Sequence, residues 1–332
     1  MTPAFPPRII LSRTDNLGDV ILTLPMAGFI KQHAPATRVY FIGKAYTRPL
    51  IEACVHVDEF LDREALLTHP ALLRDVGAGA IVFVFPDRPL AELAARVGIP
   101  VRVGTSHRWF HWRYANRLVN LSRRHAHRHE AELNVQLLKP LGLSFYGGTE
   151  QLADWYGLTK IPVFSRPDVL KPNRFHLILH PKSKGSAREW PLEKYYALAE
   201  ALSPDFQVLI TGTTAEGELI RQQKPELLRH PLVTDLTGQF SLGELMGLIA
   251  AADGLVAGST GPLHIAAALG KFALGIYPPI RPLHPGRWAP VGKKATYVCL
   301  EKACDDCRKT GDCACIRAID VAQVRKVVES WR

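Results

Sequence analysis

The sequence contains no hydrophobic run that could cross a membrane and no secretory signal at its start. None of its apolar stretches approaches the roughly 18 consecutive residues that a spanning helix requires. The first seven residues include three prolines and lack the apolar core of a signal peptide. At 332 residues, with 47% hydrophobic and 22% charged, the chain has material for two globular domains. We therefore expect a two-domain protein of the cytoplasm.

Acidic residues are missing from one long stretch, residues 102–129, which we call the basic segment. It contains seven arginines and five histidines but no Asp or Glu, and so carries most of the net charge of +10. Such a block attracts phosphates or carboxylates on nucleic acid, anionic lipid or an acidic substrate. A merely solvated basic face is the alternative interpretation.

Cysteine is nearly absent from the first 298 residues, where Cys54 stands alone. The other five lie close together near the C-terminus, at Cys299, Cys304, Cys307, Cys313 and Cys315. Clustering in a cytoplasmic chain favours metal binding or free thiols over disulfides. Four thiolates, those of Cys304, Cys307, Cys313 and Cys315, could hold a structural zinc ion. The Cys-x-Cys spacing of the last pair is not the usual zinc knuckle, so free thiols stay an alternative.

The glycine fingerprint of dinucleotide-binding enzymes is missing as well. The first expected strand, residues 8–12, is followed by T-D-N-L-G-D and not by G-x-G-x-x-G. An oxidoreductase that binds a dinucleotide is therefore the least expected function.

Short hydrophobic runs alternate with helical patterns in both halves of the chain. The strands expected in the first half are residues 8–12, 38–43 and 80–85, and those in the second are 175–180, 207–211, 254–257 and 272–277. Between the halves, residues 160–174 contain three prolines and little periodicity, which indicates a linker. The pattern predicts an α/β protein with two Rossmann-like domains that face a central cleft, where ligands bind beyond the carboxyl ends of the strands.

The segment after the first strand, residues 13–25, carries the first candidate site. Gly18 permits a tight turn, and Asp19 falls where the next helix should start. An aspartate there can be an N-cap, which is common and stabilises a helix by about 1 kcal/mol. It can also be a general base that takes a proton from a sugar hydroxyl. The spacing alone leaves both interpretations open.

Two further segments have the composition of anion-binding turns. Residues 180–191 combine hydroxyls, small residues and three cations between a strand and a helix, which suits a pyrophosphate. Residues 257–266 join glycines to Ser259 and Thr260 at the start of another helix. A solvated basic loop and an ordinary glycine-bearing turn are the respective alternatives. His264, taken by itself, is more often a hydrogen-bonded core histidine than a catalyst.

Three sequence blocks resemble the signature blocks of glycosyltransferase family 9: R-T-D-N-L-G-D-V-I-L-T-L-P, H-P-K-S-K…R-E-W-P and G-S-T-G-P-L-H-I-A-A-A-L-G-K. So do R-V-G at residues 102–104, H-E-A-E-L-N at 129–134 and L-L-K-P-L-G at 137–142. The resemblance implies the GT-B fold and an inverting transfer that requires no metal or other cofactor. It also implies a nucleotide-sugar donor, usually ADP-heptose, and a lipopolysaccharide core as acceptor.

The resemblance assigns roles to particular residues and favours Asp19 as the general base. The implied donor-binding residues are Lys182, Ser183 and Arg188 at the phosphates, Glu216 at the ribose, Gln239 and Phe240 at the base, and Ser259, Thr260 and Gly261 at the sugar-phosphate end; His264 is a further donor-binding candidate. The implied acceptor-binding residues are Arg13, Arg102, Arg108, Arg113, Arg117 and Arg124. The chain departs from the family at Ser259, where many members carry Asp or Asn, and this departure weakens the case for heptose in particular.

The resemblance also sets the expected domain limits. Residues 1–165 would form an acceptor-binding domain, residues 166–315 a nucleotide-sugar-binding domain, and residues 316–332 a helix that packs back on the N-terminal domain. The basic segment would bind an anionic glycolipid or core oligosaccharide at the inner membrane surface. Four aromatic residues suit such an interface, namely Trp109, Phe110, Trp112 and Tyr114. The alternative is a covered helix with snorkelling arginines.

Two rival functions fit parts of the sequence. A nucleotide-sugar epimerase of the same fold has no acceptor and therefore no need of the basic segment. A non-enzymatic protein that binds nucleic acid or another anionic ligand would use arginines interleaved with aromatic residues. The basic run is single, and no recognised nucleic-acid-binding motif accompanies it. We therefore expect a transferase with no nucleic-acid partner.

Overall fold

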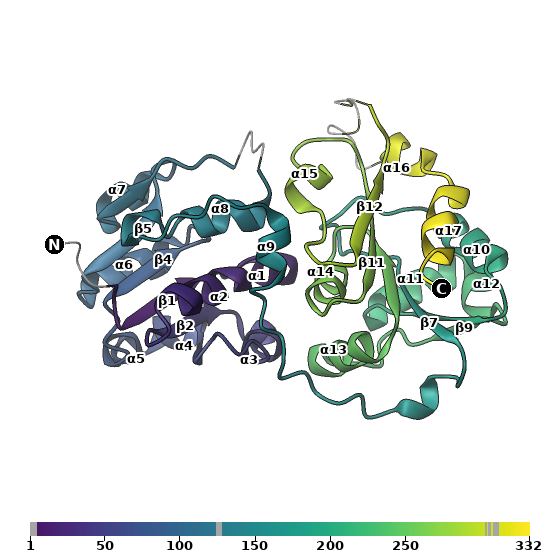
Figure 1. Cartoon of the computed structure of the whole chain (residues 1–332), viewed down its shortest axis with the longest axis horizontal. Helices are drawn as coiled ribbons and strands as arrows, with labels where there is room; N and C mark the ends of the chain where they lie inside the picture. The colour runs from purple at the N-terminus through teal and green to yellow at the C-terminus, as the bar shows by residue number, and fades with distance from the viewer. Residues whose placement is uncertain (1–4, 124–127, 303, 305–306, 308–311) are drawn as a thin grey trace. The chain divides into compact units, whose positions relative to one another are not determined.

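The chain forms two compact units, Met1–Lys160 and Ile161–Arg332 (Figure 1). The computed structural model describes residues 5–123, 128–302, 304, 307 and 312–332. The boundary between the units falls at the start of the proline-rich stretch in which the linker was expected, five residues before the division proposed from the sequence. Within the described residues, no helix combines the length and the apolar character needed to span a membrane.

The first unit is built on a parallel six-stranded sheet in the order β3-β2-β1-β4-β5-β6. Its strands are β1 (Arg8–Ser12), β2 (Arg38–Gly43), β3 (Glu59–Asp62), β4 (Ala80–Phe83), β5 (Val101–Thr105) and β6 (Arg117–Val119). Its α-helices are α1 (Leu17–Ile21), α2 (Leu24–His33), α3 (Arg48–Glu52), α4 (Arg63–Thr68), α5 (Pro70–Asp75), α6 (Arg88–Arg96), α7 (Trp109–Tyr114), α8 (Glu130–Gln136) and α9 (Thr149–Ala153). β4 is buried along its whole length, which explains its uninterrupted apolar sequence.

The second unit repeats this plan with a parallel sheet in the order β12-β11-β10-β7-β8-β9. Its strands are β7 (Phe175–His180), β8 (Phe206–Ile210), β9 (Val233–Asp235), β10 (Gly254–Ala257), β11 (Phe272–Tyr277) and β12 (Ala295–Cys299). Its α-helices are α10 (Leu192–Ala201), α11 (Thr214–Gln223), α12 (Pro225–Arg229), α13 (Leu242–Ala251), α14 (Gly261–Ala268), α15 (Pro285–Trp288), α16 (Ala314–Ala318) and α17 (Val321–Glu329).

Each sheet reverses its strand order once. In the first unit the chain runs from β1 outward to β3 and then returns to β4 on the other side of β1. In the second unit the chain runs from β7 outward to β9 and then returns to β10 on the other side of β7. Ligands of doubly wound sheets bind beyond the carboxyl ends of the strands at this point. The three candidate segments of the sequence follow β1, β7 and β10, and so all three lie at a reversal of strand order.

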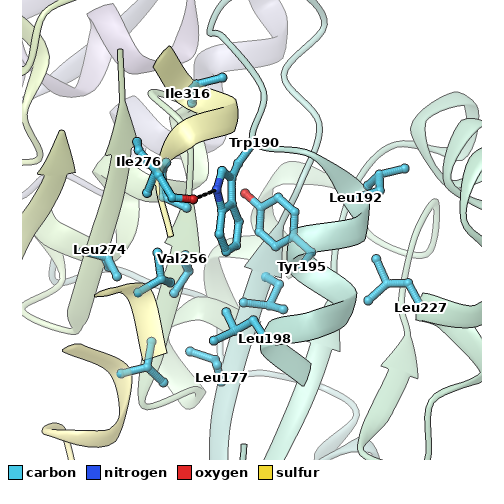
Figure 2. Packing of buried hydrophobic residues seen from close by; sticks show 14 of the residues in the cluster. Leu177, Trp190, Leu192, Tyr195, Leu198, Leu227, Val256, Leu274, Ile276 and Ile316 are labelled. Atoms are coloured by element: carbon cyan, nitrogen blue, oxygen red, sulfur yellow. Dashed lines mark hydrogen bonds between the residues drawn. The ribbon is translucent and has the colours of Figure 1, made fainter. Parts of the chain in front are cut away.

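Trp190 anchors the segment after β7 in the core of the second unit (Figure 2). Its ring is 1% exposed and lies edge-on to Tyr195 at 5.0 Å between centroids. Its indole Nε1 donates a hydrogen bond of 3.1 Å to the carbonyl oxygen of Ile319. A buried indole needs such a partner for its N–H group. The loop that leads to Trp190 is therefore attached to the core at its end.

The C-terminal helix belongs to the second unit, which corrects the prediction that residues 316–332 pack on the N-terminal domain. Val324 and Val328 of α17 are fully buried in the core of the second unit, and α17 lies against α10 (Figure 1). Trp331 stacks on Phe272 with 5.2 Å between ring centroids. The apolar face of this helix indicated that something covers it. The sequence pattern could not show which helix or domain covers that face.

Candidate active site at two reversals of strand order

Arg13 directly follows β1 and is only 2% exposed. Its guanidinium pairs with Asp19, with Asp15 at 2.7 Å from Nε to Oδ1, and with Glu130 at 3.1 Å from Nη1 to Oε1. Burial by itself would lower the pKa of Arg13, but the charges of Asp19, Asp15 and Glu130 raise it above its ordinary value. A buried charge requires such partners. We call residues 13–19 the Arg13 loop.

Helix α8 supports the Arg13 loop from far along the chain. Glu130, at its first residue, accepts a hydrogen bond from Arg13 Nη1 and forms an ion pair with Arg123, whose Nε lies 3.1 Å from Glu130 Oε1. One turn later, Asn134 Oδ1 accepts from Arg123 Nη2 at 2.7 Å. The Asn134 Nδ2 group donates to the Leu22 carbonyl at 3.0 Å. The block H-E-A-E-L-N thus ties the Arg13 loop to α8, a role that the sequence analysis did not identify.

Asp19 is not the cap of its helix. The N-cap of α1 is Asn16, in an extended conformation, and Asp19 is the third helical residue. The Asp19 side chain is 13% exposed, and its Oδ1 accepts from Arg13. Its Oδ2 accepts no hydrogen bond from the described part of the chain. The N-cap interpretation is therefore wrong, and one carboxylate oxygen is held in place while the other is open to a ligand.

A second carboxylate, missed in the sequence analysis, shares Arg13. The pKa of Asp15 is raised to about 6, because burial and the charge of Asp19 raise it by more than the charge of Arg13 lowers it. Tyr46 lies beside this pair and donates from its hydroxyl to the Asp15 carbonyl at 2.9 Å. Burial and the charges of Asp15 and Asp19 raise the pKa of Tyr46. Three carboxylates thus pair with a single buried guanidinium, and the Tyr46 phenol lies next to one of them.

Asp87, after β4, links the two strands at the reversal in the first unit. Its Oδ2 accepts from the Thr14 hydroxyl at 3.0 Å and from Arg63 Nε at 2.6 Å. Its Oδ1 accepts from the amide of Leu90, which caps α6. The Arg13 loop is therefore fixed from the β4 side as well as from α8.

Glu189 organises the segment after β7. Its Oε2 pairs with Lys182 Nζ at 2.6 Å, and its Oε1 accepts from the amide and hydroxyl of Ser183 at 2.9 and 3.0 Å. Lys184 and Gly185 turn the chain at the tip with φ of 50° and 79°. We call residues 181–190 the Glu189 loop. Two of its predicted phosphate ligands, Lys182 and Ser183, converge on Glu189, which the sequence analysis had not singled out.

The segment after β10 lies against the Glu189 loop. Ala257 is the register partner of His180, so the two segments leave adjacent strands. A Cβ atom on Gly258 would lie 3.3 Å from the carbonyl oxygen of Arg188, which explains the glycine. The approach brings Ser259, which interacts with the Tyr277 hydroxyl, to the same edge of the sheet.

Thr260 stands at the start of α14 with an unsatisfied hydroxyl. It is the N-cap residue of this eight-residue helix, is 6% exposed, and makes no side-chain capping bond. Its Oγ1 has no hydrogen-bond partner within the residues that the structure describes. A buried hydroxyl normally has a partner, and a helix N-terminus attracts anions. A phosphate oxygen at this position would satisfy both requirements.

Two further predicted donor residues, Glu216 and His264, lie on helices α11 and α14. Glu216 forms a capping box at the start of α11, with its Oε2 accepting from the Thr213 amide at 2.7 Å. His264 is 2% exposed on α14. The ring of His180 bonds to the Thr211 hydroxyl at 2.9 Å, and burial lowers the pKa of His180.

Gln239 and Phe240 lie beside the linker residues of the second unit. Gln239 is exposed, and its Oε1 accepts from Arg166 at 2.8 Å. The same guanidinium lies over the Phe240 ring at 5.6 Å, and Phe164 meets that ring edge-on at 5.8 Å. These contacts fix the orientation of the Phe240 ring near β9, and a nucleotide base could stack on this aromatic group.

Comparison with known proteins decides the family, because the profile of glycosyltransferase family 9 (heptosyltransferase) matches residues 91–315. The chain belongs to glycosyltransferase family 9. A putative glycosyltransferase of Haemophilus influenzae is 27% identical over 303 residues, which cover 86% of each chain. The structure of a family 9 glycosyltransferase from Veillonella parvula has a TM-score of 0.80 at 20% identity, over 100% of this chain and 98% of that one. That of the E. coli ADP-heptose LPS heptosyltransferase II has a TM-score of 0.73 at 18% identity, over 98% of each. The predicted family and GT-B fold are confirmed.

The arginines of this family 9 enzyme that were expected to bind the acceptor have different surroundings. Arg102 donates to the carbonyls of Tyr114 at 2.7 Å and Ile99 at 2.5 Å, so it closes the turn around β5. Arg13 is buried in the network described above. Three are exposed, namely Arg108, Arg113 and Arg117, and Arg124 lies outside the described residues.

The aromatic side chains of α7 divide into two pairs. Trp109 and Trp112 are 66% and 67% exposed. Phe110 and Tyr114 instead pack on the core of the first unit. Only two of the four aromatic residues could therefore reach a membrane interface. The set of aromatic residues predicted for that interface is reduced to the two tryptophans.

Three of the four predicted zinc ligands come together in the second unit. The Sγ atoms of Cys304, Cys307 and Cys315 all lie within 4.8 Å of one another. Cys313 is 3% exposed and precedes α16. Among the residues that the structure describes, these three cysteines form a candidate metal site.

Proposed function

We propose that this family 9 glycosyltransferase moves a heptose from ADP-heptose to an anionic acceptor of the lipopolysaccharide-core type. The transfer inverts the anomeric carbon, and Asp19 is the general base. The observation that supports this proposal is the environment of Asp19. One of its carboxylate oxygens accepts from the buried Arg13, and the other accepts no hydrogen bond from the described residues. An E. coli enzyme of the same fold is an ADP-heptose LPS heptosyltransferase, which supports the choice of donor and acceptor.

The second unit would bind the donor diphosphate. The unsatisfied Thr260 hydroxyl and the amides that begin α14 favour an anion, and Arg188 and Lys182 would add charge-assisted bonds. A bound phosphate would compete with Glu189 for Lys182, which is now held at 2.6 Å. The loop is therefore prepared to exchange an internal carboxylate for a ligand oxygen.

The chemical step is a single displacement. The acceptor hydroxyl loses its proton to Asp19 as its oxygen forms a bond to the anomeric carbon, and the bond from that carbon to the diphosphate oxygen breaks. The leaving ADP takes the electron pair, so negative charge grows at the diphosphate. Cations and amide groups at the β7 and β10 turns would stabilise that charge, and the chain needs no metal ion for this step.

Arg13 would act by positioning Asp19. Its guanidinium binds three carboxylates, so the Asp19 side chain is held in one orientation by a group that is itself fixed from α8. A base must lie within hydrogen-bond reach of the proton it removes, and a fixed carboxylate meets that need better than a mobile one.

The acceptor would bind to the first unit through exposed cations on and beside α7. Arg108, Arg113 and Arg117 are exposed there together with Trp109 and Trp112. Guanidinium groups suit phosphates and carboxylates, and indole rings suit the boundary between lipid head groups and acyl chains. We infer association with the inner face of the cytoplasmic membrane from this combination.

A transfer assay tests the proposal. The protein is incubated with ADP-heptose and a core oligosaccharide that lacks its outer heptoses, and the products are analysed by mass spectrometry and NMR. We expect one heptosyl residue on the acceptor, release of one ADP and an inverted anomeric centre. Product formation with a different nucleotide sugar alone would contradict the donor assignment. Epimerised sugar without an acceptor product would contradict transfer.

A further inference from the structure

The C-terminal thiols have the separation of metal ligands and not of a disulfide. The Sγ atoms of Cys307 and Cys315 are 3.8 Å apart, and Cys304 Sγ lies within 4.8 Å of both. A disulfide requires about 2.0 Å between its sulfur atoms. Two thiolates of a tetrahedral zinc site, each about 2.3 Å from the ion, lie about 3.8 Å apart. The observed separation matches one edge of that tetrahedron.

A fourth thiol is at hand. The Cys313 side chain interacts with that of Cys307 and is separated from Cys315 by one residue. Cys299, at the end of β12, has the Leu300 carbonyl as its hydrogen-bond partner, at 3.7 Å from its Sγ. Cys307, Cys313 and Cys315 are each at most 5% exposed, so an ion among them would be shielded from water. We propose that Cys304, Cys307, Cys313 and Cys315 bind one structural zinc ion as four thiolates.

Ordinary core packing explains this cluster less well. Free cysteine often fills a core as a small hydrophobic residue, and three of the four belong to the main core of the second unit. Packing alone, however, does not require sulfur atoms to converge on one another. Nor does it require the paired spacings Cys-x-x-Cys and Cys-x-Cys within twelve residues. Convergence from two such pairs is what a tetrathiolate site needs.

The zinc site would also support the Glu189 loop. Arg188 Nη2 donates to the carbonyl oxygen of Cys307 at 3.2 Å. Lys194 Nζ and Trp190 Nε1 both donate to the carbonyl of Ile319, which follows α16. The carbonyl of Cys307, one of the proposed ligands, therefore accepts from the loop that we propose binds the donor, and the carbonyl of Ile319, four residues beyond the last thiol, accepts from Trp190 at the end of that loop. This second step rests on the proposed function, whereas the metal site does not.

Metal analysis of the purified full chain tests the site directly. Protein prepared under reducing conditions with zinc should contain one zinc per chain after gel filtration. Protein loaded with Co²⁺ instead should show the absorption of tetrahedral cobalt bound to thiolates. Zinc well below one per chain, or a cobalt spectrum without sulfur ligands, would overturn the proposal. Both measurements use the unaltered chain, so a poorly folding variant cannot obscure the result.

Single substitutions assign the ligands. Zinc content should fall at least several-fold in C304S, C307S, C313S and C315S. It should stay at one per chain in C54S, which alters a buried thiol of the first unit, and in C299S, which alters the neighbouring thiol. Loss of zinc from C299S but not from C313S would contradict the choice of the fourth ligand. Equal loss from C54S would indicate general unfolding and no specific site.

The link to the donor is measured separately. Removing zinc with a chelator should weaken ADP binding several-fold by calorimetry, and restoring zinc should recover it. Unchanged ADP affinity in the zinc-free chain would contradict the supporting role of the segment. That outcome would leave the zinc stoichiometry, and with it the proposed metal site, unaffected. The metal site would also be unaffected by a failure of the transfer assay. The two proposals can thus fail independently.

Discussion

The Arg13 loop and the Glu189 loop occupy equivalent places in the two units and have opposite charge. Each follows the central strand of its sheet, at the reversal of strand order. In the first, one buried arginine is surrounded by the carboxylates of Asp15, Asp19 and Glu130. In the second, one glutamate is approached by Lys182 and Ser183, with Arg188 and Lys184 in the same loop. The same topology thus holds a surplus of carboxylates in one unit and of cations in the other.

The difference suggests a division of labour. A surplus of carboxylates around a fixed cation can accept a proton but repels a diphosphate. A surplus of cations beside a helix start attracts a diphosphate but offers no base. We therefore assign proton removal to the first unit and donor binding to the second.

The largest effect is expected when the base is removed. Asp19→Asn keeps the size of the side chain but cannot take a proton, so the transfer rate should fall by roughly 10²–10⁴. ADP affinity should stay within a few-fold, because we propose that Asp19 removes a proton and that the phosphates are bound by the second unit. Turnover is followed by mass spectrometry and ADP binding by calorimetry.

Asp75→Asn is the matched control for this variant. Asp75 is an exposed aspartate at the end of α5 in the same unit, and its replacement should leave both quantities unchanged. Normal turnover by Asp19→Asn would rule out the general-base assignment.

The next largest effect concerns the cationic loop. Arg188→Ala removes the charge-assisted bond that we propose to the donor diphosphate, and it should weaken ADP binding by about 1.5–3 kcal/mol. Calorimetry gives this directly. Arg325→Ala, on the exposed face of α17, removes the same charge from the same unit and should have no effect. Equal ADP affinity in wild type and Arg188→Ala would contradict the assignment of this loop.

The acceptor surface should respond to charge removal without affecting the donor. Replacing Arg108, Arg113 and Arg117 together by glutamine should loosen attachment to anionic vesicles by about 1 kcal/mol per arginine. The apparent KM for the acceptor should rise and the ADP affinity should not change. Vesicle co-sedimentation at moderate salt and initial rates measure the two effects.

A second triple variant serves as the control for charge alone. Arg38, Arg48 and Arg74 are exposed on other parts of the first unit, and glutamine at all three lowers the net charge equally. This variant should keep most of the vesicle binding. If both triple variants lost attachment to the same degree, the binding would follow total charge and not the surface at α7.

The smallest effect is a pH dependence of stability at the Arg13 loop. Burial raises the pKa of Asp15 from 3.8 to about 6, so its neutral form is favoured in the folded chain. Its contribution to stability is complete below the unfolded pKa and is lost as the pH rises through about 6. Asp15→Asn should therefore gain on the wild type, by on the order of 1 kcal/mol, as the pH rises across that window. Urea unfolding at several pH values measures the difference.

Asp58→Asn should show the opposite trend. Burial would raise the pKa of Asp58, but hydrogen bonds from Lys31 and the Val39 amide lower it. Its contribution to stability is therefore present at neutral pH and is lost as the pH falls through its lowered pKa. Parallel trends in the two variants would contradict the local origin of the Asp15 shift.

Local patterns were sufficient to predict the strands β1, β2, β4, β7, β8, β10 and β11 and the turns that carry the candidate site, but they did not reveal β3, β5, β6, β9 and β12. The apolar run of β4 is visible in the sequence because a parallel strand must be buried on both faces. The turns after β1, β7 and β10 could then be located, because each directly follows such a run. Partners distant in sequence were not predictable. Glu130 meets Arg13 across 117 residues, so no short motif contains the pair. The amphipathic pattern of α17 likewise showed a covered face but not that α10 covers it.

The most direct test compares Asp19→Asn and Arg188→Ala in the same two assays. Turnover is measured at saturating ADP-heptose, and ADP affinity is measured by calorimetry on the same preparations. If the two loops divide the work, Asp19→Asn loses turnover with normal ADP affinity, and Arg188→Ala loses ADP affinity and recovers turnover as the donor concentration rises. Loss of both quantities to the same degree in either variant would contradict the division.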